Sequence, residues 1–161
     1  MASFTFRHAR SSDAPLVWAV RTDAIRSTCS SHYPKEIIDS WSTTAMPDTF
    51  GSVLEKEQFV VAELNGEIVG FAGLKTEARE VDAVFVSPSI SGTGLGWQLL
   101  KQVETQARKL GFKTITLHAS LNAVLFYLRS GYSEVGKGFH SSKSGLQIAC
   151  VHMEKQLDSV A

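Results

Sequence analysis

Residues 81–100 read VDAVFVSPSISGTGLGWQLL, and this stretch decides the fold. The β-branched run at 81–86 is typical of a strand, a loop dense in glycine follows, and residues 94–110 have the apolar spacing of a helix that stops at Gly111. A glycine-rich loop that leads into a helix presents free backbone N–H groups to an anion. We therefore predict a phosphate-binding loop here, with a merely flexible turn as the alternative interpretation of the segment.

Two well-known phosphate loops do not fit this segment. A nucleotide-hydrolysing P-loop reads GxxxxGK[ST], and no Lys-Ser or Lys-Thr follows these glycines. A dinucleotide fingerprint reads GxGxxG, whereas Gly92, Gly94 and Gly96 give GxGxG, and no acidic residue closes the next strand at 117–119. The expected ligand is phosphorylated but is neither NAD nor ATP.

The flanking sequence predicts an α+β (mixed α/β) fold. Asn65-Gly66, a favoured type I′ turn, joins the β-rich runs 58–64 and 67–74 into a hairpin. Further strands are expected around Phe4 and Phe6 and at 113–119, 132–140 and 146–154. Helices are expected from a Ser11 or Ser12 cap to Arg26, after Pro34 through Trp41, between Asp48 and Glu57, and at 121–130. No repeat or linker divides the chain, so we expect one domain over residues 1–161.

Composition excludes several classes of partner. Sixteen basic and sixteen acidic residues give no net charge, which argues against nucleic acid or an anionic membrane as partner. Cys29 and Cys150 fit no CxxC or zinc spacing, so we expect free thiols and no metal. No apolar run is long enough to span a membrane and the first residues lack a signal-peptide core, which predicts a cytoplasmic protein.

Two motifs resemble those of the GCN5-related N-acetyltransferases. The first is Val86-Ser-Pro88-Ser-Ile-Ser91-Gly92-Thr-Gly94-Leu95-Gly96, similar to V-x-P-x-x-[Q/R]-G-x-G-[I/L]-G of that family, with Ser91 in place of Gln or Arg. The second resembles A-x-x-[F/L]-Y-x-x-x-G-[F/Y] and consists of Ala123, Phe126, Tyr127, Gly131 and Tyr132. Both motifs occur in order within 81–132, and the stretches HASLNAVLFYLRSGY (118–132) and VHMEKQL (151–157) also look like those of small bacterial acetyltransferases.

The resemblance implies a central, mostly antiparallel sheet of about seven strands, a splayed central strand pair and helices on both faces. It implies acetyl-CoA as cosubstrate, with its acyl end between strands 81–86 and 113–119. A primary amine of a small molecule, or of a peptide, would attack it directly in a ternary complex. The implied cofactor-binding residues are Phe85, Val86, Ser91, Gly92, Thr93, Gly94, Leu95, Gly96, Trp97, Ser120, Asn122 and Phe126.

Three residues are the catalytic candidates. Tyr127 would protonate the departing thiolate, with a core aromatic as the alternative. Glu80 and Asp82 would accept the proton of the amine, with solvated strand-end carboxylates as the alternative. His118 is a candidate for a relay or a structural imidazole.

Helix 121–130 is expected to bury two faces. The core-facing side comprises Leu121, Val124, Leu125 and Leu128, and the cofactor-facing side comprises Ala123, Phe126, Tyr127 and Ser130.

The acceptor is expected near the first two helices, against Arg26, His32, Tyr33 and Trp41. Lys101, Arg129 and Lys137 are candidates for neutralising the 3′-phosphate of the cofactor, or else solvated surface residues. A CoA-binding sensor without turnover and a transferase of longer acyl groups remain alternatives. Dimerisation is common in the family, and the final strands are a candidate dimer surface.

Overall fold

The Asn65-Gly66 turn connects β2 (Gln58–Leu64) to β3 (Glu67–Lys75) in the computed structural model. Both turn residues have positive φ, 53° and 82°, as a type I′ turn requires, so the predicted hairpin is confirmed. The structure describes residues 3–141 and 145–158.

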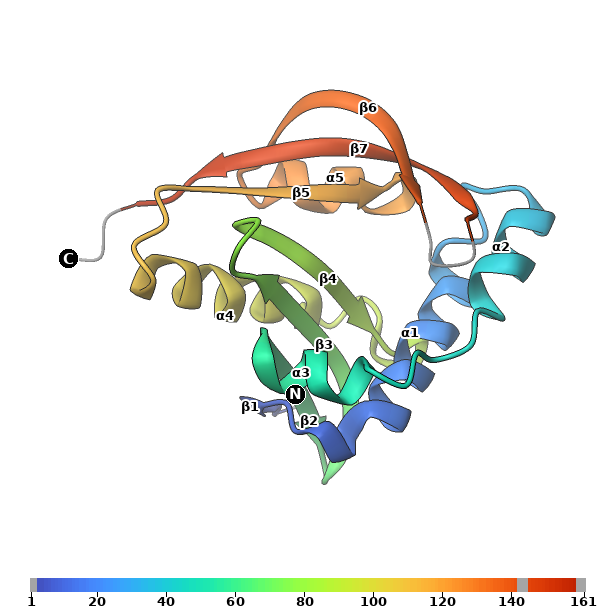
Figure 1. Ribbon diagram of the computed structural model, residues 1–161, viewed down its shortest axis with the longest axis horizontal. Coiled ribbons are helices and arrows are strands. Elements are labelled where there is room, and N and C mark those ends of the chain that lie inside the picture. The colour runs from blue at the N-terminus through green and yellow to red at the C-terminus, as the bar shows by residue number, and fades with distance from the viewer. Residues whose placement is uncertain (1–2, 142–144, 159–161) are drawn as a thin grey trace.

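Seven strands of the described chain form one mixed sheet (Figure 1). The other strands are β1 (Thr5–His8), β4 (Glu80–Val86), β5 (Thr114–Ser120), β6 (Ser133–Ser141) and β7 (Gln147–Gln156). Their spatial order is β1-β2-β3-β4-β5-β7-β6, and the β4–β5 pair alone among these is parallel. The predicted α+β class with a mostly antiparallel sheet is therefore confirmed.

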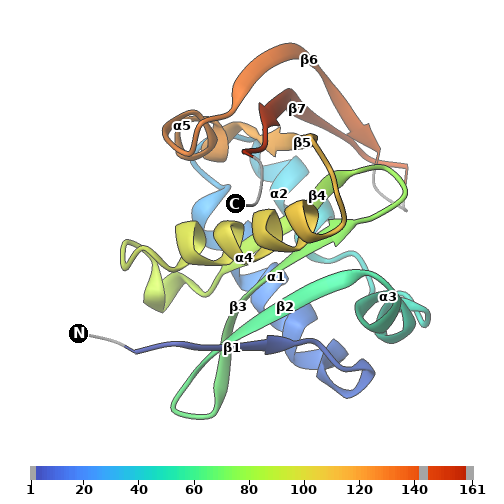
Figure 2. The ribbon, with the colours of Figure 1, turned by 90° about the vertical axis from the view of Figure 1, so that its left-hand side faces the viewer.

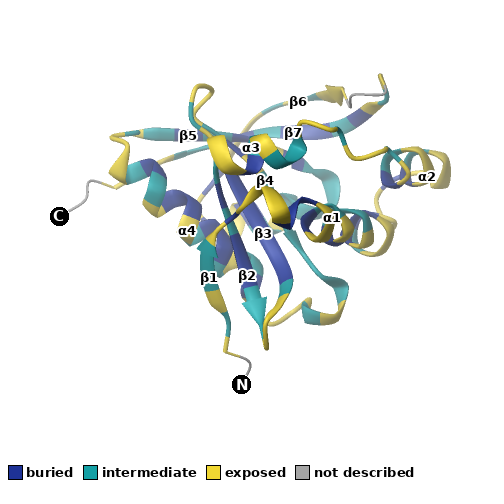
Figure 3. Cartoon of the chain, turned by 60° about the horizontal axis from the view of Figure 1, so that its bottom comes forward, coloured by how far each residue is buried: buried dark blue, intermediate teal, exposed yellow. Residues whose placement is uncertain are grey.

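Helices cover both faces of the sheet (Figure 2). They are α1 (Ala14–Thr28), α2 (Lys35–Ser42), α3 (Phe50–Lys56), α4 (Leu95–Lys109) and α5 (Val124–Arg129). Leu99, Leu100 and Val103 of α4 are fully buried with Leu74 and Ile115 on one face. On the opposite face, apolar residues of α1 and α3 pack on β2 and β3, whose buried strands are visible in Figure 3. No helix among the described residues is long and apolar enough to cross a membrane.

Two local expectations need correction. Helix α1 begins at Ala14, after a 3₁₀ turn at Ser11–Asp13, and no serine side chain caps it. In α5 the predicted core-facing side is only partly covered: Leu125 and Leu128 are 63% and 43% exposed. The helix is short and buries Tyr127, whereas its outer face stays exposed among the described residues.

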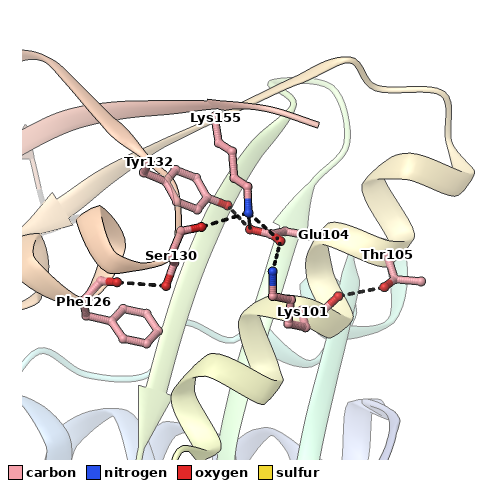
Figure 4. Close-up of polar contacts among 7 residues, drawn as sticks. All are labelled: Lys101, Glu104, Thr105, Phe126, Ser130, Tyr132 and Lys155. Atoms are coloured by element: carbon pink, nitrogen blue, oxygen red, sulfur yellow. Dashed lines mark hydrogen bonds and ion pairs between the residues drawn. The ribbon is translucent and has the colours of Figure 1, made fainter. Parts of the chain in front are cut away.

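A buried carboxylate joins α4 to the end of the chain (Figure 4). Glu104 is fully buried, and Lys155 of β7 approaches both of its oxygens at 3.1 and 3.2 Å while donating to the Ser130 carbonyl at 2.8 Å. Tyr132 donates to the same carboxylate at 2.8 Å. Because Ser130 and Tyr132 directly follow α5, this cluster holds α5 against α4.

Candidate active site

The central strands β4 and β5 separate soon after they meet. They pair only at Glu80–Thr116 and Val81–Leu117, so the β5-facing backbone edge of residues 82–86 has no strand partner among the described residues. A cavity of about 470 Å³ occupies the opening, with walls from α1, α2, α3 and α5 as well as from the strands. Figure 1 shows the two strands close at one end and apart at the other, which confirms the splayed pair.

The glycine loop lies between β4 and α4 with its backbone donors available. Gly92 and Gly94 have φ of 82° and 86°, a conformation that favours glycine. Among the described residues, the backbone N–H groups of residues 92–97 have no hydrogen-bond acceptor. Free donors at the N-terminus of a fifteen-residue helix form a site for an anion.

The loop also touches the second motif. A Cβ on Gly96 would lie 3.6 Å from the Phe126 ring, so α5 lies directly beside the start of α4. Trp97 is 51% exposed on the first turn of α4, and the Lys101 ammonium lies 5.2 Å from its ring centroid. Ser91 and Thr93 are exposed, and Thr93 donates to the Ile90 carbonyl at 2.7 Å. Their roles in cofactor binding stay predictions.

Tyr127 differs from the two other tyrosines in what its hydroxyl does. Tyr33 donates to the Ala149 carbonyl at 2.6 Å and accepts from the Leu121 N–H, and Tyr132 donates to Glu104. The Tyr127 hydroxyl makes no hydrogen bond with the described residues, although its ring is 6% exposed and lines the cavity. Burial raises its pKa, so the phenol keeps its proton.

The two candidate carboxylates both line the cavity. Glu80 Oε2 lies 3.3 Å from Nε2 of His118 on the neighbouring strand. Asp82 Oδ1 lies 3.2 Å from Nζ of Lys75. The Asp82 charge is thus compensated by an ammonium, whereas Glu80 faces an imidazole.

Three further polar side chains converge beside Glu80. His118 of β5 meets Cys150 and His152 of β7, and their ligand atoms lie within 4.8 Å of one another. Both cysteines are free thiols, as expected, and buried. These residues could hold a metal ion, although cysteine spacing in the sequence pointed to none.

The wall formed by α1, α2 and α3 carries several aromatic side chains and one arginine. Trp18, Trp41 and Phe50 line it together with Val53, and the Arg21 guanidinium lies 4.1 Å from the Trp18 ring centroid. Arg21 Nη2 donates to the Trp41 carbonyl at 3.0 Å, whereas Nη1 is buried and has no hydrogen-bond partner in the described part of the chain. Burial lowers the Arg21 pKa to about 10, so the side chain stays a cation near neutral pH.

The family follows from these features together with a direct match of the sequence. Residues 29–157 match the model of the acetyltransferase (GNAT) domain, and this range spans both motifs and the splayed strands. The chain belongs to the GNAT family. GNAT domains are acetyl-CoA-dependent acyltransferases, so residues 29–157 are an acyltransferase domain of that kind.

Individual GNAT relatives agree in fold and sequence. The GCN5-related N-acetyltransferase structure from Rhodopseudomonas palustris has a TM-score of 0.89 and 27% identity, covering 98% of each chain. YafP of Escherichia coli K12, named an uncharacterized N-acetyltransferase, is 27% identical over 84% of this chain and 85% of its own. The uncharacterized N-acetyltransferase MJ1207 of Methanocaldococcus jannaschii is 30% identical over 92 residues. These residues are 50% of this chain and 41% of MJ1207, so the match spans less than half the length of that relative.

Several residues predicted for the GNAT site lie elsewhere or serve the fold. Of the four acceptor candidates, Tyr33 and Trp41 line the cavity, whereas Arg26 donates to Ser42 and His32 contacts Ser31. Ser120 lines the cavity. Asn122 hydrogen-bonds to Cys29, which directly follows α1, and its Oδ1 is buried without a hydrogen-bond partner among the described residues. Arg129 and Lys137 are exposed. The sequence analysis missed Arg21 and Trp18, because the only signal was their spacing on one helical face.

Proposed function

We propose that this protein transfers the acetyl group of acetyl-CoA to a primary amine of a small molecule, by direct attack in a ternary complex. The observation that carries the proposal is the Tyr127 hydroxyl, which is free in the cavity between the separated strands. The glycine loop lies at the start of α4, next to the helix that carries this tyrosine. In this proposal the cofactor extends from the glycine loop to the cavity, where its thioester meets the proton donor.

In this proposal the unpaired N–H groups of residues 92–97 bind the pyrophosphate of the cofactor. The pantetheine arm runs along the free edge of β4, where backbone groups of Phe85 and Val86 hydrogen-bond to it. An N–H donor there also stabilises the oxyanion that forms at the thioester carbonyl, by about 3 kcal/mol in oxyanion holes generally. Ser91 is shorter than the usual Gln or Arg, so the backbone carries most of the binding.

The reaction then needs one proton acceptor and one proton donor. The acceptor ammonium loses a proton to the Glu80 carboxylate, directly or through water, and Asp82 is the second candidate. The free amine attacks the thioester carbon, the cationic nitrogen of the tetrahedral intermediate loses its second proton to water, and the carbon–sulfur bond breaks. Tyr127 donates its proton to the departing thiolate, so that the amide and free CoA leave and the phenolate regains a proton from solvent.

Cavity size and lining support a small acceptor. A volume of about 470 Å³ must hold both the acetyl end of the cofactor and the amine, which favours a compact molecule over a folded protein surface. The aromatic wall of Trp18, Trp41 and Phe50 suits a flat or apolar acceptor body. The unpaired Nη1 of Arg21 suits an oxygen on that body, such as a carboxylate or carbonyl. A cytoplasmic location and dimerisation remain proposals.

One experiment tests the proposal directly. The full chain is mixed with acetyl-CoA and a panel of small amines, with and without an oxygen substituent, and release of the CoA thiol is followed with EDTA present. Amine-dependent release is the expected result. Acetyl-CoA binding in calorimetry without turnover on any amine, peptide amines included, would instead favour a CoA sensor, and absence of binding would overturn the cofactor assignment.

A further inference from the structure

One end of the cavity wall brings three metal-binding side chains onto one face of two paired strands. His118 of β5 is the register partner of His152 of β7, and Ser120 is the partner of Cys150. Register partners point to the same side of an antiparallel pair, so the two imidazoles and the thiol share that side. Cys150 Sγ lies 3.8 Å from His118 Nδ1, and the two imidazole centroids are 4.3 Å apart.

His118 is oriented as a metal-ligating histidine commonly is. Its Nε2 lies 3.3 Å from the Glu80 carboxylate, which leaves Nδ1 directed at the thiol. Ligating histidines typically donate their second ring N–H to a carboxylate, which fixes the tautomer and raises the basicity of the ligating nitrogen. Glu80 supplies such a partner from a third strand.

His152 provides the second, independent observation. Its Nε2 is buried and has no hydrogen-bond partner among the described residues, a state that ordinarily destabilises a folded protein. Strand β6 keeps the space beside it open, because the register partners of His152 and Cys150 are Gly136 and Gly138. A Cβ on Gly138 would lie 3.0 Å from this nitrogen.

We propose that His118 Nδ1, Cys150 Sγ and His152 Nε2 bind a divalent transition metal ion, Zn²⁺ above all, with Glu80 holding His118 in place. One thiolate and two imidazoles are ligands that Zn²⁺ favours. Zinc distances of about 2.0–2.3 Å put tetrahedral ligand atoms roughly 3.5 Å apart. The 3.8 Å between Cys150 Sγ and His118 Nδ1 is near that value. All the ligand atoms lie within 4.8 Å of one another, so rotation of the side chains can bring them to zinc-binding distances.

The fourth coordination position faces the cavity, since His118 and Cys150 both line it. Three protein ligands and one open position are typical of zinc sites that exchange water or a ligand, whereas structural sites carry four protein ligands. On binding, the Cys150 thiol loses its proton to solvent and sulfur coordinates as thiolate. The sequence could not show this set, because its members lie on two strands and match no linear zinc motif.

Titration of the full chain with Co²⁺, followed by competition with Zn²⁺, tests the proposal. We expect a thiolate-to-cobalt charge-transfer band that saturates at one ion per chain and disappears when Zn²⁺ is added. Cys150→Ser should remove the band, and His152→Ala should weaken Zn²⁺ binding more than tenfold. Cys29→Ser, the matched control at the other buried cysteine, should retain both. A wild-type protein without the band, or an undiminished band in Cys150→Ser, would overturn the proposal.

Glycine variants probe the site without changing a ligand. Gly138→Ala places a methyl group against His152 Nε2 and should weaken Zn²⁺ binding at least tenfold, whereas Gly136→Ala, with nothing within 4 Å of its Cβ position, should not. Glu80→Ala should weaken it by about 10- to 100-fold, as loss of such carboxylates does elsewhere. Equal affinity in all three variants would contradict the geometry.

A further measurement needs no variant, in case one fails to fold. Zn²⁺ should slow alkylation of Cys150 in the wild-type protein and leave Cys29 unchanged, as read from peptide masses. Equal protection of both thiols, or none, would also overturn the site.

Discussion

The hydroxyl of Tyr132 donates a 2.8 Å hydrogen bond to Oε2 of Glu104, a carboxylate that is completely buried. The Tyr132 N–H in turn bonds to the Tyr127 carbonyl at 3.0 Å. A charge on α4 thereby fixes the turn that ends α5, and with it the helix that carries Tyr127 into the cavity.

Replacing Glu104 should therefore destabilise the fold strongly. Glu104→Gln leaves the Lys155 ammonium, whose side chain is 15% exposed, without its carboxylate. Loss of one member of a buried ion pair costs about 3–5 kcal/mol, to be measured by urea unfolding. Adding Lys155→Met should recover part of that loss, and Glu134→Gln on the exposed strand β6 is the matched control. A loss under about 1 kcal/mol would show that the Lys155 ammonium does not depend on the Glu104 charge.

Tyr127→Phe should lower kcat by about 100-fold or more at an unchanged Kd for acetyl-CoA, since it removes only the proton donor. Tyr132→Phe serves as the control. It should lower stability through the lost Glu104 contact and affect kcat far less. Similar kcat values for Tyr127→Phe and wild type would remove the general-acid role while leaving cofactor binding intact.

The two carboxylates of β4 should not contribute equally. Glu80→Gln is expected to lower kcat by about 100-fold or more, because that carboxylate contacts the His118 imidazole and forms no ion pair with a lysine or arginine among the described residues. Asp82→Asn should have the smaller effect, since Lys75 already compensates Asp82 at 3.2 Å. Steady-state rates with EDTA present compare the two, and a larger loss in Asp82→Asn would transfer the base role to that residue.

Features of the fold and of the site could be predicted from the sequence where a few consecutive residues encode them. The Asn65-Gly66 turn, the glycine loop and Tyr127 are encoded over a few consecutive residues, and the first two have the expected backbone conformation. Burial of Leu125 and Leu128 was wrong, because a helical stripe cannot show which of its sides finds a partner.

Contacts between side chains that lie far apart in the sequence could not be predicted from it. The Glu104–Lys155 pair, 51 positions apart, depends on how α4 lies against β7. The His118–Cys150–His152 group, whose members lie up to 34 positions apart, depends on the register of β5 and β7. Arg21 lies in a helix whose apolar spacing indicated only packing. Only the packing of α1 with α2 and α3 around the cavity shows that its Nη1, which has no partner among the described residues, belongs to a residue of the cavity wall.

Asp13 should make stability depend on pH. Its carboxylate accepts from Arg7 at 2.8 and 2.9 Å, and chiefly this contact lowers the pKa of Asp13. A lowered carboxyl pKa means that the stabilisation is complete above the unfolded value of about 3.9 and is lost as the pH falls through the folded value.

Asp13→Asn should thus cost about 1–3 kcal/mol in urea unfolding at pH 7 and progressively less in acid. Asp39→Asn, at an exposed pair with Lys35, should show little change at either pH. A constant difference between wild type and Asp13→Asn from pH 7 to below pH 3 would show that ionisation of Asp13 is not its source.

Arg21→Met should impair the acceptor and spare the cofactor. Methionine keeps much of the apolar length over Trp18 but removes the donor at Nη1, so an acceptor oxygen loses its partner. Net contributions of about 1.5–3 kcal/mol for hydrogen bonds to charged groups correspond to a rise of about 10- to 100-fold in the acceptor KM. Arg26→Met, on the same helix but outside the cavity lining, is the matched control. An acceptor without the oxygen should have the same KM with the wild type and with Arg21→Met, because it makes no hydrogen bond to Nη1. If its KM rises as much as that of the acceptor with the oxygen, the effect comes from disturbing the contact between Arg21 and Trp41 instead.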